Sequence, residues 1–239
     1  WNVTLQVPVL DAVIARKPAA ILIAPTDKVQ LVEPLRKAYD AGITVVCVDT
    51  FIGTGKFQTG SGDADFPISY IASDNVLGGR MAARALAKAI GEKGKVYVSN
   101  VKPGVSTTDQ REEGFKDEMK SFPGVEVLET QFNDDDANKA ASQVQAVFGR
   151  TPDLAGVFGA NLFSATGSAN GVKQAGQAGK IKQLIGRFSH SRDNDNDIIP
   201  VCFFSDDALS NRLHFFYVLD GRTAKFHDNG IHITLRHHF

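Results

Sequence analysis

The sequence predicts an α/β fold of two lobes, each a parallel sheet flanked by helices, with a cleft between the lobes. Short apolar runs alternate with stretches of helical periodicity over residues 1–186, which is the rhythm of successive strand–helix–strand units. Several runs end in a polar side chain, and the carboxyl ends of parallel strands share the edge at which such folds bind ligands. The sequence therefore predicts a site for a small polar ligand.

Residues 1–72 are predicted to form the first lobe. The elements expected there are a helix through residues 9–14, a strand at Ala20–Ala24, a helix at Lys28–Asp40 and a strand at Ile43–Val48. The strand at Ala20–Ala24 is wholly apolar, as strands buried on both faces of a parallel sheet are. Residues 51–67 are polar and rich in glycine, without a period, and are expected to form a loop.

Residues 73–186 are predicted to form the second lobe. A brief apolar segment at Ser69–Ala72 leads into Ser73, Asp74 and Asn75, which are expected to cross between the lobes and to act as part of a hinge. Strands are expected at Lys95–Ser99, Val125–Glu129, Leu154–Gly159 and Ile181–Ile185, and helices at Val76–Ile90, Thr108–Lys120, Asp136–Phe148 and Ser164–Gln174.

Residues 187–239 form a tail of different composition. They hold all six histidines but only two alanines, and residues 191–197 (SRDNDND) have no pattern of a helix or strand. We predict that this tail is not a native-like completion of the fold, and that it arises from a frameshift, a rearrangement or a doubtful sequence assignment.

Composition excludes several classes of function. A net charge of −1 gives no basic surface for nucleic acid, and no apolar run is long enough to span a bilayer. Cys47 lies inside an expected strand and is predicted to be a buried hydrophobic residue, so a disulfide with Cys202 has little support. We expect a monomer.

Three motifs resemble sites for a nucleotide or a metal ion, but none of them supports an enzyme, a cofactor or a metal. Gly53-Thr-Gly55-Lys56 lacks the earlier glycine and the following Ser or Thr of a phosphate-binding loop. His227, His232 and His237 have no partner at zinc-ligand spacing. Asp134–Asp136 precede a predicted helix, where carboxylates cap free N–H groups more readily than they bind a metal. A Rossmann-type oxidoreductase or a kinase therefore has weak support.

Five strings, in this order along the chain, closely resemble the ribose-type periplasmic sugar-binding proteins of ABC transporters. They are ARKPAAILIAPTD (15–27), AGITVVCVDT (41–50), YIASDN (70–75), QREEGF (110–115) and AGVFGAN (155–161). The resemblance covers about residues 7–186. It implies a cleft that closes on one sugar, with hydrogen bonds to hydroxyls and aromatic rings against the sugar faces.

The resemblance also implies site residues. Asp49, with Thr50 beside it, matches a first-lobe carboxylate at a strand end; Arg111 matches an arginine that grips hydroxyls; Asn161 matches an asparagine at a strand end. Each has a structural alternative: a cap for Asp49 and for Asn161, and an ion pair with Glu112 or Glu113 for Arg111.

The chain also departs from the family. The position of a stacking aromatic falls at Asp135, with Phe132 and Phe163 as substitutes, and Arg187-Phe188 stands where the family has Phe-Asp. The family's opening strand, helix and second strand are expected before Trp1, and its last crossings have no counterpart in the tail. Both predicted lobes are therefore incomplete by comparison with the family.

The resemblance implies a solute-binding component of an ABC transporter, with no enzymatic activity and no cofactor, that delivers a sugar or polyol to a membrane permease. Such a protein would be located in the periplasm or, in a Gram-positive bacterium, outside the cell and held by a lipid anchor. The same fold serves as the effector domain of lactose-repressor-like regulators, so the fold alone does not decide the role. A signal peptide upstream of Trp1 would support transport, and a helix-turn-helix would support the regulator.

Overall fold

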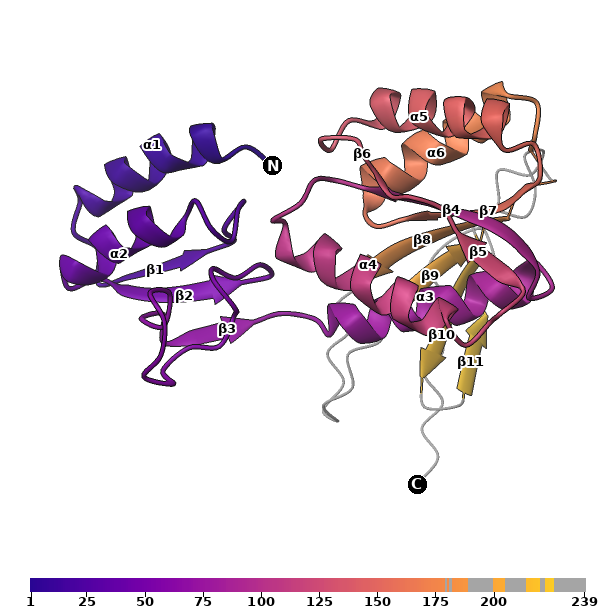
Figure 1. Ribbon diagram of the computed structural model, residues 1–239. Coiled ribbons are helices and arrows are strands. Elements are labelled where there is room, and N and C mark those ends of the chain that lie inside the picture. The colour runs from indigo at the N-terminus through magenta and orange to yellow at the C-terminus, as the bar shows by residue number, and fades with distance from the viewer. Residues whose placement is uncertain (179, 181, 189–199, 205–213, 220–221, 226–239) are drawn as a thin grey trace. The chain divides into compact units, whose positions relative to one another are not determined.

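A computed structural model describes residues 1–178, 180, 182–188, 200–204, 214–219 and 222–225 of the chain (Figure 1). Its contacts divide the chain into two compact units: residues 1–75 with 102–110, and residues 76–101 with those from 111 onward. The first junction thus falls after Asn75, and residues 102–110 belong to the first unit although they follow a strand of the second. Residues 191–197 and the three histidines named above lie outside the described residues.

The first unit contains a parallel sheet of strand order β1-β2-β3. Its elements are α1 (Val3–Ile14), β1 (Ala20–Ile23), α2 (Val32–Asp40), β2 (Thr44–Val48) and β3 (Ser69–Ile71). Helix α2 begins four residues later than predicted, and residues 28–31 form turns ahead of it. The Asp27 carboxylate accepts hydrogen bonds from the N–H groups of Val29 and Gln30 in these turns, at 2.9 and 2.8 Å.

Helices α1 and α2 lie over one face of this sheet (Figure 1). That face carries the alternate residues Ile21, Val45 and Cys47, which are buried against Leu31 and Leu35. Burial raises the pKa of the Cys47 thiol to about 11, which keeps it protonated and unreactive at neutral pH. The prediction that Cys47 is a buried apolar residue is confirmed.

The opposite face of the first sheet is open among the described residues. Leu22 and Val46 form one pair on this face, and Val48 and Ile71 form another. Leu22 is 71% exposed and Ile71 62% exposed, although parallel sheets are normally covered on both faces. This open face is an apolar surface of the first unit.

The glycine-rich loop of the first unit is organised by its own aspartate. Asp65 accepts hydrogen bonds from the N–H groups of Thr59, at 2.8 Å, and Gly60, at 2.7 Å. The hydrogen bond from the Thr59 N–H is the largest cause that lowers the pKa of this carboxyl. The predicted loop therefore has a defined conformation that depends on an ionised side chain.

The Asp65→Asn variant is expected to loosen the loop, because an amide accepts more weakly than a carboxylate. Since the folded-state pKa is below the unfolded value of 3.8, the bonds stabilise the loop above that pH and weaken as the pH falls through the folded pKa. Amide exchange measured by NMR should become faster at Thr59 and Gly60. The control is Asp63→Asn, an exposed position in the same loop. Equal exchange in the two variants would contradict the role of Asp65.

The second unit is built on a sheet of order β11-β10-β9-β8-β7-β4-β5, with β6 pairing the end of β4. The chain forms α3 (Asn75–Ala89), β4 (Gly94–Asn100), α4 (Ser106–Met119), β5 (Val125–Val127), β6 (Gln131–Phe132), α5 (Ala137–Arg150), β7 (Leu154–Gly159), α6 (Leu162–Gln174) and β8 (Lys182–Phe188). Asn75 and residues 106–110, which begin α3 and α4, are counted with the first unit. Strands β5, β4, β7 and β8 are parallel, as the rhythm of the sequence predicts.

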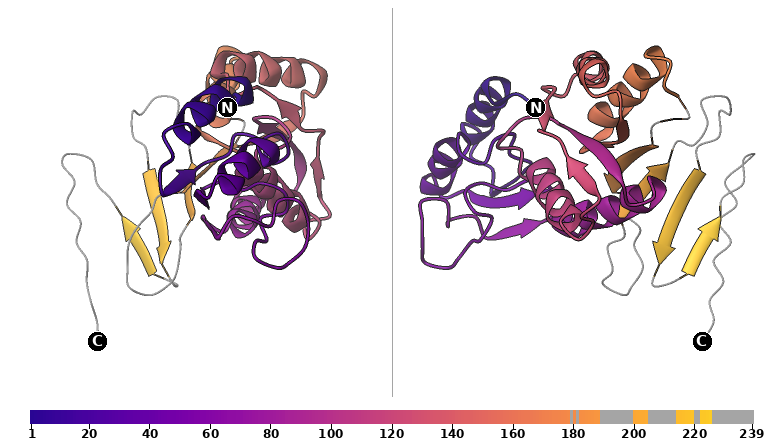
Figure 2. Two further views of the ribbon diagram at one scale, coloured as in Figure 1. Left: turned by 90° about the vertical axis from the view of Figure 1, so that its left-hand side faces the viewer. Right: turned by 45° about the vertical axis from the view of Figure 1, so that its right-hand side comes forward.

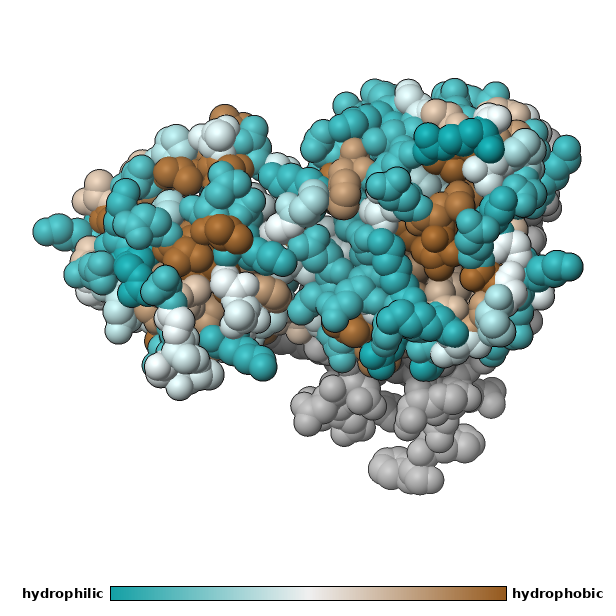
Figure 3. Space-filling view, in the orientation of Figure 1, coloured by the Kyte–Doolittle hydropathy of each residue, from teal (hydrophilic) through white to brown (hydrophobic). Residues whose placement is uncertain are grey.

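Both faces of the central strands β4 and β7 are largely buried. Val96 and Val98 of β4 face α3 and α4, where the rings of Phe115 and Phe158 stack at 4.3 Å. Tyr97 points to the other face and packs with residues of α5 and α6. Figure 3 shows apolar residues gathered near β5, where a groove is lined by residues that include Met119, Val125 and Val127.

Three described strands of the tail extend the second sheet. They are β9 (Pro200–Phe204), β10 (His214–Leu219) and β11 (Arg222–Lys225), and they pair antiparallel to one another and to β8. Figure 2 shows β10 and β11 at the far edge from β5. The sequence predicted neither these strands nor the two-residue β6.

Candidate functional site

Asp49 lies just after the carboxyl end of β2. The resemblance implies that a carboxylate at this edge of the sheet binds the ligand. Its backbone has a φ of +64°, a left-handed conformation that Asp and Asn tolerate better than most residues. Its N–H donates to the carbonyl of Ile71 at 2.9 Å, and its own carbonyl accepts from the Tyr70 hydroxyl at 3.1 Å. Two neighbours on β3 thus fix the backbone of an exposed carboxylate.

Thr50 has a different setting. Its side chain is fully buried, and the hydroxyl donates to the carbonyl of Pro25 at 2.7 Å. The Thr50 hydroxyl thus ties the end of β2 to the end of β1. A role for Thr50 as a direct ligand contact stays a prediction, and the observed bond indicates a role in holding Asp49.

The polar residues that follow β1, Thr26 and Asp27, also make hydrogen bonds within the first unit. Burial raises the pKa of Asp27, but hydrogen bonds from Gln30 and Val29 and the charge of Lys102 outweigh it, so the pKa lies below its usual value. Gln6 of α1 accepts from the N–H and hydroxyl of Thr26, at 2.8 and 2.7 Å. These polar residues build the sheet edge beside Asp49.

Arg111 lies on α4 in the second unit. Its Nη1 donates to the carbonyl of Ala160, which follows the end of β7, at 3.0 Å. This bond holds a half-buried guanidinium against the carboxyl edge of the sheet. A planar guanidinium suits hydroxyls or a ring oxygen, and the role of Arg111 as a ligand contact stays a prediction.

Asn161 takes the capping role that was its structural alternative, and its role as a ligand contact stays a prediction. Its side-chain oxygen accepts from the N–H of Ser164 at 2.9 Å and caps α6, while its Nδ2 donates to Asp135 Oδ1 at 2.6 Å. Arg111 and Asn161 are linked through Ala160, and Asn161 and Asp135 are linked directly. The structure therefore brings three of the predicted site residues together at one edge of the second sheet.

The loop that carries Asp135 is set by a buried asparagine. Asp135 has a φ of +64°, and its N–H donates to Asn133 Oδ1 at 2.9 Å. Asn133 Nδ2 in turn contacts the hydroxyls of Ser99, at 3.0 Å, and Ser164, at 2.7 Å. Sequence reasoning missed Asn133, although an asparagine just before an acidic turn was a usable signal.

Phe163 lies in the first turn of α6, two residues beyond Asn161, and its side chain is 48% exposed. Phe132, the other aromatic candidate, lies in β6 and is half-buried. Phe163 is thus the more exposed of the two aromatic candidates, and its role as a stacking residue stays a prediction.

The predicted hinge residues follow β3. Ser73 and Asp74 lie between β3 and α3, and Asn75 is the first residue of α3. Asn75 is buried, and its Nδ2 donates to the Ser73 carbonyl at 3.1 Å. The junction between the two units falls directly after Asn75.

The acidic cluster caps a helix, as predicted. Asp136 accepts from the N–H groups of Asn138 and Lys139, at 2.7 and 3.2 Å, and Asp134 pairs with the Lys139 side chain. Among the described residues, no group of three His, Cys, Asp or Glu side chains is arranged to hold a metal ion.

No helix in the described part of the chain is long and apolar enough to cross a membrane.

Two sheets with parallel strands, each bearing polar residues at its carboxyl edge, define the periplasmic-binding-protein fold that the sequence predicts. The model of the periplasmic binding protein domain matches residues 1–188, and the chain belongs to this family. The match ends next to the start of the tail predicted to diverge.

Two curated relatives are sugar-binding proteins. The D-ribose/D-allose-binding protein of Pseudomonas aeruginosa is 31% identical over 180 residues, which are 74% of this chain and 54% of the relative. The ribose import binding protein of Salmonella typhimurium is 34% identical over 158 residues, which are 66% of this chain and 50% of the relative. The chain thus spans about half the length of these relatives.

Two solved structures from Agrobacterium vitis are similar to the chain. An ABC transporter solute-binding protein bound with α-D-tagatopyranose is 77% identical, with a TM-score of 0.74, over 75% of this chain and 60% of the other. A second solute-binding protein, with bound D-fucose, is 31% identical, with a TM-score of 0.70, over 77% of this chain and 61% of the other.

Proposed function

We propose that the chain belongs to a sugar-binding component of an ABC transporter, and that its ligand is D-tagatose or a closely related pyranose. The observation that carries this proposal is the 77% identity to a solute-binding protein that holds α-D-tagatopyranose. The curated relatives are likewise named as sugar-binding or sugar-import proteins. These names favour transport over the regulator reading.

The polar groups at the two sheet edges suit a polyhydroxylated ligand. The carboxylate of Asp49 can accept from two neighbouring hydroxyls, and the guanidinium of Arg111 can donate to others through charge-assisted bonds. The exposed ring of Phe163 offers an apolar surface to the C–H face of a pyranose. We propose that closure about residues 73–75 brings these groups to the same sugar.

Membership of the periplasmic binding protein family supports a location outside the cytoplasmic membrane. The partner we propose is a membrane permease that receives the sugar from the closed protein. No residue of the described part is proposed as catalytic.

Calorimetric titration with D-tagatose is expected to show binding with sub-millimolar affinity. D-Fucose and D-ribose serve as comparisons, because they are pyranoses or pentoses that relatives bind or import. Because the chain spans 60% of the tagatose-binding relative, the natural protein encoded by the whole gene is titrated in parallel. Absence of binding to all three sugars in both preparations would overturn the proposed function.

Asp49→Asn is expected to weaken tagatose binding about tenfold, because the amide removes the charge from bonds to the hydroxyls. Asparagine tolerates the left-handed backbone at this position, so the loop keeps its conformation, whereas alanine would add strain. Titration calorimetry gives the affinity, and Asp40→Asn, on an exposed aspartate at the end of α2, is the matched control. Unchanged affinity of the Asp49 variant would remove this carboxylate from the site.

A further inference from the structure

Helices α3 and α4 of the second unit cross with their backbones in contact at two glycines. A methyl group at Gly79 of α3 would overlap the carbonyl oxygen of Arg111 and lie 2.8 Å from the N atom of Phe115. A methyl group at Gly114 of α4 would overlap the carbonyl oxygen of Val76 and lie 2.8 Å from its carbonyl carbon. Both clashes are with backbone, which cannot move aside as a side chain can.

Glycine is unfavourable inside a helix, so these two positions need a reason. Gly149 of α5 provides the contrast, because a methyl group there meets no atom within 4 Å. At Gly79 the reason is the close approach of α4, and the nearest atom belongs to Arg111 itself. The helix crossing and the proposed sugar-binding arginine are therefore one local structure.

We infer that the glycine crossing of α3 and α4 is the positioning device for the Arg111 guanidinium. Real Cβ atoms do not lie within 3.0 Å of a backbone oxygen, and a Cβ at position 79 would lie 2.0 Å from that of Arg111, so alanine would push α4 away by roughly 1 Å. The displaced residue is Arg111, whose Nη1 makes a 3.0 Å bond to the Ala160 carbonyl. A guanidinium that must regain this place at each binding event costs affinity, as loss of preorganisation does.

Other contacts hold the later turns of α4 in place, so the strain of a methyl group at position 79 falls on the turn that carries Arg111. Phe115, one turn after Arg111, is fully buried and stacks on Phe158 at 4.3 Å. On the outer side, Arg84 of α3 pairs with Glu118 of α4 at 2.6 Å. Gly79 and Gly114 are therefore positioning residues, and they touch no ligand in this proposal.

The test is a double-mutant cycle, and it rests on the proposed function through its sugar titration. Gly79→Ala is expected to weaken tagatose binding about tenfold, while Gly149→Ala leaves it unchanged. In an Arg111→Ala background, Gly79→Ala should lower the tagatose affinity by less than a further twofold. The guanidinium that Gly79→Ala would displace is absent from this background. Unchanged affinity in Gly79→Ala, or an equal tenfold loss in both backgrounds, would overturn the inference.

A second readout does not depend on sugar. The side-chain ¹⁵N resonances of Arg111, assigned by their loss in Arg111→Lys, should shift in Gly79→Ala and stay in place in Gly149→Ala. If Gly79→Ala does not give a folded protein by circular dichroism, Gly114→Ala takes its place. Failure of the wild-type protein to bind sugar would overturn the proposed function, whereas unshifted Arg111 resonances would overturn the positioning role by itself.

Discussion

Replacing Arg111 with alanine is expected to weaken tagatose binding about 100-fold, the largest effect on binding that we predict. The loss corresponds to one or two hydrogen bonds from a charged donor, each contributing about 1.5–3 kcal/mol. The change also leaves the buried carbonyl of Ala160 without the donor at 3.0 Å, so a small loss of stability should accompany it. Titration calorimetry and urea denaturation separate the two effects.

Two further variants sharpen this test. Arg111→Lys keeps the positive charge but loses the planar fork, so its affinity should lie between wild type and Arg111→Ala. Arg84→Ala removes an exposed arginine that pairs with Glu118, and it should change affinity little. If Arg111→Ala binds as tightly as Arg84→Ala, the assignment of the second-unit site is wrong.

Replacing Glu112 with alanine is expected to lower the stability of the second unit by about 2–4 kcal/mol, because several donors lose one acceptor. Asn100 Nδ2, Thr130 Oγ1 and Lys116 Nζ each donate to this carboxylate at 2.6 Å. Asn100 is fully buried at the end of β4, so its amide cannot turn to water for a replacement. Hydrogen exchange measured by mass spectrometry on peptides of β4 and β7 reports this unit separately from the first.

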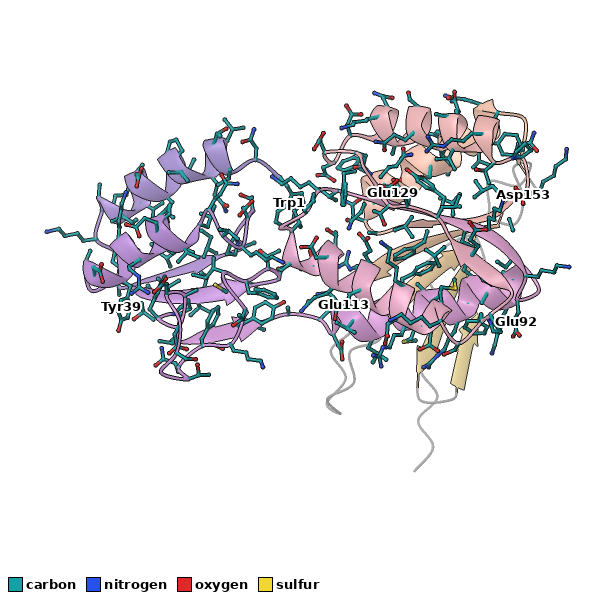
Figure 4. All side chains as sticks on the ribbon, viewed as in Figure 1. Trp1, Tyr39, Glu92, Glu113, Glu129 and Asp153 are labelled. Carbon is teal, nitrogen blue, oxygen red and sulfur yellow. The ribbon has the colours of Figure 1, made fainter. Side chains whose placement is uncertain are left out.

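The neighbouring Glu113 provides the matched control. It is exposed on α4 and labelled in Figure 4, and its change to alanine should leave exchange in β4 and β7 close to that of the wild type. Glu112→Gln should fall between, because an amide offers a single acceptor oxygen where the carboxylate offers two. Equal protection in the Glu112→Ala and Glu113→Ala proteins would show that the cluster around Glu112 contributes no stability.

Strands and helices of the two sheets could be predicted from periodicity because their burial repeats along the chain. Strand β7 is observed at its predicted residues, and β1 ends one residue earlier than expected. Strand β6 was missed because two residues carry no period, and its pairing depends on the distant end of β4. The tail strands were missed for a similar reason, since their pairing partners are set by the sheet rather than by local pattern.

The site was predictable in part. The resemblance indicated Arg111 and Asn161, and the bond from Arg111 to the carbonyl of Ala160, the residue just before Asn161, places them together. The link between Asn161 and Asp135 could not be read from the sequence, because it joins two loops 26 residues apart. The buried bond of Thr50 to Pro25 was also hidden, since a residue at a strand end can point to ligand or to protein with the same sequence.

The open face of the first sheet has a practical consequence for every measurement above. Leu22 and Ile71 expose apolar surface, and β1 has no strand on its outer edge among the described residues. Sulfate and phosphate strengthen contacts between such surfaces, whereas cooling weakens them. Titrations in dilute chloride buffers at low temperature will therefore report on sugar, while sulfate-rich solutions will favour contacts between chains.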